Sequence, residues 1–242
     1  MTRGILITGN SSSLFSAAAA EAAKRVESFI LVQIPNRFLK PDGGGVPPHQ
    51  TETVENPGQN PNGSATPSGG AVPLSWNPAS PISARTLVLA AENRMEKINN
   101  AILICSPPAV FKTAETLTPQ EIDFIVNDDI KGWFLLVREL VLYFRRVGSG
   151  SLSFVVPEIS SGGGAKNTPV DLLGPAALAS FQAFAQSILA SSANEPFEVL
   201  GFTGFEAGSE AEFIPWLFKI IDEGSKKNSG RWHRYSKLRL FK

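Results

Sequence analysis

The residue types and segments that this sequence lacks exclude several classes of protein before any motif is considered. Of its 242 residues only Cys105 is a cysteine, so no disulfide can form within the chain and nothing points to an oxidising compartment. Lysine plus arginine and aspartate plus glutamate each total 22, which leaves no net charge to attract nucleic acid or an anionic membrane. No apolar run approaches the ~20 residues of a membrane-spanning helix, and the N-terminus has no basic start followed by a long apolar stretch. We therefore expect a cytoplasmic protein with neither nucleic acid nor a membrane as partner.

Residues 40–75 contain no aromatic residue and are rich in glycine and proline. Such a composition cannot bury enough apolar surface to offset the entropy lost on ordering. We expect an insertion here between the second and third strands, and two interpretations stay open. It is either a mobile surface segment or a lid over a ligand site, because long loops in compact domains are often functional.

The rest of the chain alternates short apolar, β-branched segments with helix-like segments. We expect strands at 4–8, 28–34, 71–76, 100–105, 151–156 and 197–203, and a last strand within 230–241. We expect helices at 13–25, 80–95, 118–146, 173–192 and 210–224.

The order of these segments predicts the fold class. Strand–helix alternation is typical of parallel βαβ units with right-handed crossovers, and continuously apolar strands are typical of a sheet covered on both faces. We expect one α/β domain over residues 1–242, with a Rossmann-like, doubly wound parallel sheet of about seven strands and helices on both faces.

Several stretches resemble the short-chain dehydrogenase/reductase family along almost the whole chain. They are Thr8-Gly9 at the end of the first strand, "SWNPASPISARTLVLAAENR", "DDIKGWFLLVREL", "PAALASFQAFAQSILA" and "SGRWHRYSKLRLF". The resemblance concerns the framework of the fold, so it implies the fold more strongly than any chemistry. It allows NADP or NAD as a cofactor and implies neither with certainty.

The loop that resembles the family's phosphate-binding TGxxxGxG motif keeps only its first glycine, Gly9. The second and third glycines fall on Ser13 and Phe15, where glycine would allow close backbone approach to a pyrophosphate. Two interpretations remain for the polar side chains: they hold a phosphate, or they cap the following helix without a ligand. The resemblance implies these candidate cofactor-binding residues in the loop: Gly9, Asn10, Ser11, Ser12 and Ser13.

Two further positions that resemble cofactor contacts have changed. The second strand of an NAD-preferring relative ends in an acidic residue, whereas Arg37 lies near that place here and could meet the 2′-phosphate of NADP. Asn77 stands where the family has an aspartate after the third strand, and it keeps hydrogen-bonding capacity without the charge.

The family's catalytic tyrosine and lysine are both replaced. The alignment places Asp171 at the tyrosine and Pro175 at the lysine. Proline has no charge to offer, and an ionised aspartate is a poor proton donor to a carbonyl unless its pKa is strongly raised.

The supporting catalytic positions have changed as well. The serine position falls near Glu158, or on Ser160 or Ser161, and the asparagine position falls on Asp129. We find no substitute set. The only tyrosines are Tyr143 and Tyr235, and neither histidine has a metal or triad partner in the sequence pattern, so we expect no metal site and treat all the catalytic positions as degenerate.

Helices 118–146 and 173–192 carry more apolar residues than contact with one sheet requires. In the family these helices form a four-helix interface, so the resemblance implies a homodimer or homotetramer here, or a hetero-oligomer with an active relative. Three functions stay open: a non-catalytic nucleotide-binding or structural subunit, a divergent NAD(P)-dependent oxidoreductase with non-standard catalytic residues, and a binder of an unrelated ligand at the carboxyl ends of the strands.

Overall fold

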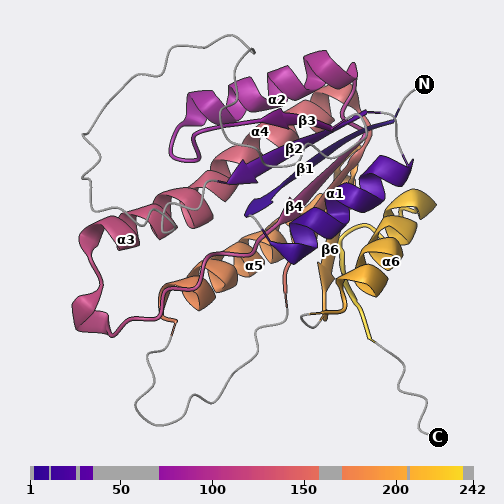
Figure 1. Cartoon of the computed structure of the whole chain (residues 1–242). Coiled ribbons are helices and arrows are strands. Elements are labelled where there is room, and N and C mark those ends of the chain that lie inside the picture. Colours follow the sequence, from indigo (N-terminus) through magenta and orange to yellow (C-terminus); the bar gives the residue numbers. More distant parts are fainter. Residues whose placement is uncertain are drawn as a thin grey trace, which may run out of the picture.

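Seven parallel strands form one sheet in the order β3-β2-β1-β4-β5-β6-β7 (Figure 1). The computed structural model describes residues 3–10, 12–25, 28–34, 71–157, 171–205 and 208–236. The strands are β1 (Gly4–Asn10), β2 (Ser28–Ile34), β3 (Ala71–Leu74), β4 (Asn100–Ile104), β5 (Ser151–Val155), β6 (Glu198–Thr203) and β7 (Arg231–Arg234). The predicted doubly wound parallel sheet is confirmed.

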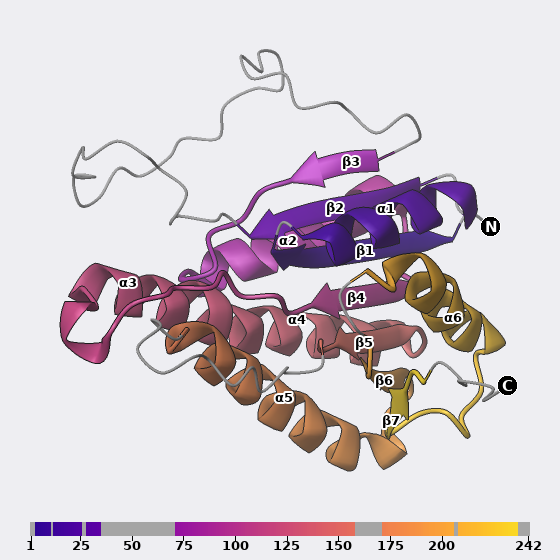
Figure 2. The same ribbon diagram turned by 60° about the horizontal axis from the view of Figure 1, so that its bottom comes forward.

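Helices cover both faces of this sheet (Figures 1 and 2). Buried residues of α2, α4 and α5 form one apolar cluster with the sheet, and those of α1 and α6 form a second cluster on the opposite face. The helices are α1 (Ser13–Arg25), α2 (Pro81–Met95), α3 (Pro119–Phe124), α4 (Gly132–Val147), α5 (Leu173–Ser191) and α6 (Glu210–Glu223), with short turns η2 (Ala114–Thr116) and η4 (Ser192–Asn194).

Local sequence explains where two of these helices begin. The Ser80 side chain accepts a hydrogen bond from the Ser83 amide, and Pro81 stands at the first helical position of α2. Thr118 and Glu121 form a complete capping box at the start of α3. Both starts agree with the predicted boundaries to within a residue.

Two predicted boundaries are wrong in ways that bear on the site. The first strand continues past residue 8 to Asn10, which places the Asn10 side chain on the sheet itself. The third strand ends at Leu74 rather than at residue 76. It stops early because the backbone at Asn77 turns into α2, with the Ser80 amide donating to the Asn77 carbonyl oxygen.

The predicted helix over 118–146 is continuous but not uniform. A π-helical segment, η3 (Ile125–Lys131), lies between α3 and α4. Asp128 and Asp129, adjacent in sequence, are both buried in this segment. π-Helical turns are rare and are frequent at functional sites. The sequence pattern gave no indication of it.

Helix α5 has an unusual composition. In the described part of the chain, Leu173–Asn194 is the one helical stretch whose length and hydropathy alone would suit a membrane span. Core helices of soluble proteins pass the same test, and here Phe181, Ala185 and Leu189 are buried in the cluster on one face of the sheet. No residue from Leu173 to Ser191 is charged.

Candidate functional site at the carboxyl edge of the sheet

The strand order reverses direction between β1 and β4, which lie side by side at the centre of the sheet. In doubly wound sheets the crevice outside the carboxyl ends of such strands is where ligands bind. β1 ends at Asn10, and β4 is followed directly by Cys105 and Ser106. The candidate site is therefore built around these three residues and the segments that meet them.

Asn10 joins three segments at this point. Its Nδ2 donates to Asp129 Oδ1 of η3 at 2.9 Å, and its Oδ1 accepts from the Ser106 amide at 3.3 Å. The side chain is almost fully buried. Asn10 therefore ties β1 to the loop after β4 and to the π-helical segment, and both ends of its amide already have partners within the protein.

Asp129 is the most strongly perturbed acid of this cluster. The pKa of its carboxyl is raised from 3.8 to about 6. Burial is the largest cause, the hydrogen bond from Asn10 lowers the pKa, and the neighbouring Asp128 charge raises it. Cys105 is fully buried, and burial together with the Asp129 charge raises the pKa of its thiol. A carboxyl group at the switch point, the place where the strand order reverses between β1 and β4, thus changes its protonation near neutral pH.

The loop before α1 is occupied by the protein's own side chains. Ser12 Oγ accepts a hydrogen bond from the Phe15 amide at 3.1 Å, so it caps the helix. The Phe15 ring is buried in the α1–α6 cluster, and one ring carbon lies 3.3 Å from where a Cβ on Gly9 would stand. Ser13 Oγ donates to Glu210 Oε1 at 2.7 Å.

Glu210, in the first turn of α6, is a residue that the sequence reasoning missed. The hydrogen bond from Ser13 lowers the pKa of its carboxyl, so it is ionised at neutral pH. A carboxylate therefore lies at the N-terminus of α1, where the helix dipole favours an anion. The acidic residues that begin α6 were visible in the sequence, but their pairing with a serine 197 positions away was not.

Of the remaining candidate cofactor-binding residues, the structure describes only Asn77. Asn77 Oδ1 accepts from the Ala79 amide at 3.1 Å and the Asn77 amide donates to Ser83 Oγ at 2.8 Å, so this residue shapes the turn into α2. Ser11, Arg37 and Glu158 lie outside the described residues, as do the alternatives Ser160 and Ser161.

The two positions aligned with the catalytic tyrosine and lysine are both found at the start of α5. Asp171 precedes the helix and forms a β-bridge with Phe111. Its Oδ1 accepts from the Val110 amide at 3.1 Å and from the Gly174 amide at 3.0 Å, so the carboxylate joins the loop after β4 to the first turn of α5. Pro175 is exposed in that first turn, where the missing amide hydrogen costs nothing.

Neither tyrosine lies with these residues. Tyr143 is buried in α4, where its hydroxyl accepts from the Ile98 amide at 2.8 Å, close to the start of β4. Tyr235 follows β7 and donates to Glu212 of α6 at 3.2 Å. Within the described ranges, no group of three histidine, cysteine, aspartate or glutamate side chains could hold a metal ion.

Solved structures of short-chain dehydrogenases are similar to this chain over nearly its full length. A short chain dehydrogenase from Mycobacterium smegmatis has a TM-score of 0.69 at 13% identity and covers 99% of this chain and 94% of its own. An NADH-dependent reductase A1-R′ complexed with NAD has 0.68 at 14% identity, with 97% and 95% covered. A short chain dehydrogenase from Bacillus anthracis has 0.68 at 13%, with 97% and 95% covered.

No protein-family profile and no curated protein sequence matches the chain. Identity this low establishes the fold alone. The predicted resemblance to the short-chain dehydrogenase/reductase fold is therefore confirmed, and the activity does not follow from it.

Proposed function

We propose that this protein has the shape of a short-chain dehydrogenase/reductase without its standard hydride-transfer activity, and that it serves as a structural or partner subunit. The observation that carries the proposal is the pair of hydrogen bonds that Asp171 accepts. Its carboxylate binds the Val110 and Gly174 amides, and Pro175 follows where an ammonium would be needed. A side chain that accepts two amide hydrogen bonds, with no cation supplied by position 175, supports the absence of the family's usual proton donor.

The surroundings of α1 support weak dinucleotide binding or none. The ionised Glu210 carboxylate bonded to Ser13 would repel a pyrophosphate at the helix N-terminus. The buried Phe15 ring fills the place beside Gly9 that a glycine would leave open. NADP or NAD binding belongs to the alternative function rather than to this one.

The exposed surfaces of η3, α4 and α5 support the role of a partner subunit. Val126, Phe134 and Leu142 are spaced by eight residues along the composite helix and are 44%, 43% and 48% exposed. The Phe134 ring packs 4.0 Å, centroid to centroid, from the Phe184 ring of the uncharged α5. The exposed Arg138 lies between Phe134 and Leu142 on α4. Exposed apolar side chains grouped in this way support a protein–protein contact. We propose that it forms a homodimer or homotetramer, or a hetero-oligomer with an active relative.

One observation favours the alternative of a divergent NAD(P)-dependent oxidoreductase. The Asp129 carboxyl lies at the switch point with its pKa raised to about 6, which is the range in which a general acid works best. This alternative needs a cofactor in the crevice and a route for the proton from a side chain that is 3% exposed.

Cofactor binding separates the two functions. A ligand that binds the folded state must stabilise it. Because we expect no useful cofactor binding, millimolar NAD(H) or NADP(H) should leave the melting temperature and the calorimetric baseline unchanged. The double variant Asp171→Tyr with Pro175→Lys should also remain inactive with carbonyl substrates. Saturable binding followed by cofactor-dependent carbonyl reduction in the unaltered protein would establish the alternative.

Assembly is tested separately by sedimentation velocity. Phe134→Glu should convert a dimer or tetramer to monomers, because it replaces an exposed aromatic ring of the proposed contact with a charge. Ile82→Glu on α2, where Ile82 is 77% exposed, is the matched control and should leave the assembly intact. A monomeric unaltered protein with no co-purifying partner would refute the subunit role.

A further inference from the structure

Positive charge is concentrated at the end of this chain. Residues 224–242 include seven lysine or arginine residues and no aspartate or glutamate, although the whole chain has 22 residues of each charge. Just before this stretch, Asp222 is already paired with Arg3 and Arg25. A protein that is neutral as a whole therefore carries a local excess of cations near its last strand.

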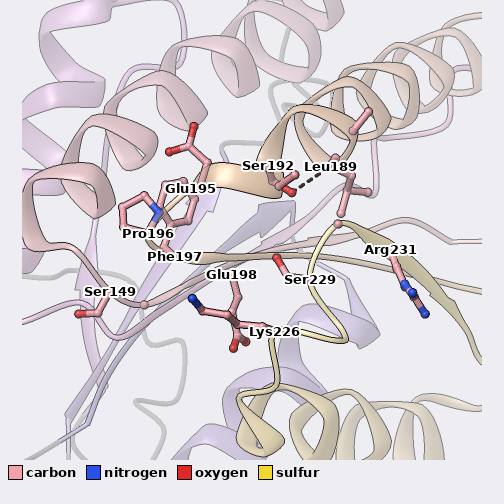
Figure 3. A pocket seen from close by; sticks show the side chains of 14 residues that line it. Ser149, Leu189, Ser192, Glu195, Pro196, Phe197, Glu198, Lys226, Ser229 and Arg231 are labelled. Atoms are coloured by element: carbon pink, nitrogen blue, oxygen red, sulfur yellow. Dashed lines mark hydrogen bonds between the residues drawn. The ribbon is translucent and has the colours of Figure 1, made fainter.

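Two of these cations line a cavity of about 580 Å³ at the amino edge of the sheet, where the turns before β5, β6 and β7 meet (Figure 3). Glu198, at the start of β6, lines the same cavity. In Figure 3 Lys226 crosses in front of Glu198, whereas Arg231 lies beyond the turn that carries Ser229. Arg231 is exposed and forms no ion pair within the described residues, so its charge belongs to the last strand of the sheet.

That strand, β7, is also an edge of the sheet. Within the described part of the chain it pairs with β6 alone. A strand at an edge presents a row of backbone N–H and C=O groups that can pair with another strand. The strand at the other edge, β3, contains Pro73, which has no N–H to donate. None of the four residues of β7 is a proline, so β7 is the edge better able to accept a further strand.

The charges around β7 select the kind of strand that can pair with it. Arg231 and Arg234 stand at the two ends of the strand, and Lys226 and Lys227 lie in the turn that precedes it, all four exposed. Cations on an edge strand oppose pairing with another basic edge, including the β7 of a second copy, because like charges repel. The same cations attract a strand that carries carboxylates.

The aromatic side chains among these cations pack against the sheet and α6. The Trp232 ring lies over Gly201, where a Cβ would stand 2.5 Å from a ring carbon. The His233 ring lies 5.5 Å from the Phe202 ring, centroid to centroid, and the Tyr235 ring packs on α6. Single-stranded nucleic acids stack their bases on free aromatic faces, and this arrangement does not favour them. Among the described residues from 219 to 236, no large hydrophobic side chain is exposed for insertion into a bilayer.

We propose that β7 binds an extended, acidic segment of a partner protein, which adds one strand to the edge of the sheet. Backbone hydrogen bonds to β7 hold the segment, and its carboxylates lie against Arg231 and the cations of the preceding turn. The proposal does not rest on the subunit role, because the contact proposed above involves η3, α4 and α5 rather than this edge.

The probe is a capped peptide of alternating glutamate and valine, titrated into the full chain by isothermal titration calorimetry. We expect saturable, submillimolar binding that weakens as salt is added, because salt screens exposed charges. A peptide with lysine in place of glutamate has the wrong charge, and a peptide with N-methylated valines lacks backbone donors. Each should bind at least about tenfold more weakly than the probe.

Several results would overturn the proposal. They are the absence of saturation, and equal binding of the probe and its N-methylated form. Tighter binding of an oligothymidylate of equal charge, or of vesicles that contain phosphatidylserine, would do the same, because neither can add a strand. In hydrogen exchange the probe should protect the amides of residues 231–234, and protection elsewhere without protection there would exclude strand addition.

Charge reversal assigns the contact to this edge. Arg231→Glu should bind the acidic peptide at least about tenfold more weakly and the lysine peptide more tightly. Arg94→Glu, on the exposed side of α2, is the matched control and should bind as the unaltered protein does. Arg231 is exposed, so its variant should remain folded by circular dichroism, and unchanged binding in it would refute the site. Phe134→Glu should also bind the acidic peptide normally, which separates this site from the proposed assembly.

Discussion

The two edges of this sheet differ in how their polar side chains are partnered. At the carboxyl edge Asn10, Ser13 and Asp171 each bond to another part of the same chain. At the amino edge Glu198 and Arg231 line a cavity and have no such partners within the described residues. At the edge where this fold generally binds ligands, these three side chains instead hold parts of the same chain together. Substitutions at Gly9, Asp129 and Asp171 should weaken or strengthen these internal contacts, and one at Glu210 shows whether its contact with Ser13 also excludes phosphate.

The largest effect is expected at Gly9. A Cβ at this position would stand 2.7 Å from the Ile104 carbonyl oxygen and 3.0 Å from the Ile104 Cβ, neither of which can move without shifting β4. Gly9→Ala should therefore lower the free energy of unfolding by about 3 kcal/mol, as in other overpacked cores. Chemical denaturation measures it. If alanine leaves stability unchanged, Gly9 is available for a ligand rather than required for packing.

The next effect concerns Asp129. Its folded-state pKa is raised from 3.8 to about 6, so the folded state holds the proton more tightly than the unfolded state. The stability linked to this group is fully present below pH 4 and is lost as the pH rises to about 6, a difference of about 3 kcal/mol. Asp129→Asn removes that loss and should stabilise the protein at pH 8 by about 2 kcal/mol.

Denaturant titrations between pH 4 and pH 8 check this prediction. Asp123→Asn, on the exposed side of α3, is the matched control and should follow the unaltered protein across that range. A destabilised Asp129→Asn at pH 8 would mean that the carboxylate, rather than the carboxylic acid, is needed by Asn10.

A smaller loss is expected at Asp171. Asp171→Ala leaves the Val110 and Gly174 amides without their acceptor, which should cost about 1.5 kcal/mol because Asp171 is only partly buried and water can reach the vacated side. Asp171→Asn retains an acceptor oxygen and should recover most of that stability. Urea denaturation measures this loss. If Asp171→Ala is as stable as the unaltered protein, Asp171 has no structural role and a catalytic or ligand-binding role becomes the better explanation.

The smallest effect on stability is expected at Glu210, whose hydrogen bond with Ser13 is exposed to solvent. Glu210→Gln should change the unfolding free energy by less than about 0.5 kcal/mol. It should also leave the protein without detectable NADPH binding by thermal shift, because Phe15 still fills the loop. A melting temperature that rises with NADPH only in this variant would make the Glu210 charge the sole barrier to the cofactor.

The sheet and its helices could be read from the sequence because the relevant signals are local. Continuous apolar strands, the Ser80-Pro81 start of α2 and the capping box at Thr118 each occupy only a few residues. The alternation of strands with helices then leaves few topologies to consider. The π-helical segment was missed because the apolar periodicity of residues 118–146 does not distinguish a short π-helical turn from the α-helix around it.

The site could be predicted only in part, because its contacts join residues far apart in the chain. Asn10 and Asp129 were both named as candidates, but nothing in the sequence indicated that they bond to each other over 119 positions. The bond between Ser13 and Glu210 and the cavity near Glu198 form only when distant turns meet in the folded chain. The resemblance to the family indicated which of its groups are replaced here, and the structure supplied the partners of the replacing side chains.

The complete burial of Cys105 has a practical value for the experiments above. As the only thiol in the chain, with no accessible surface, it will react slowly with maleimides under native conditions. A cysteine introduced at the exposed Ala183 of α5 can then carry a single fluorophore or spin label, with no need to remove the native one. Distances between labels on two copies would report directly on how α5 is arranged in an assembly.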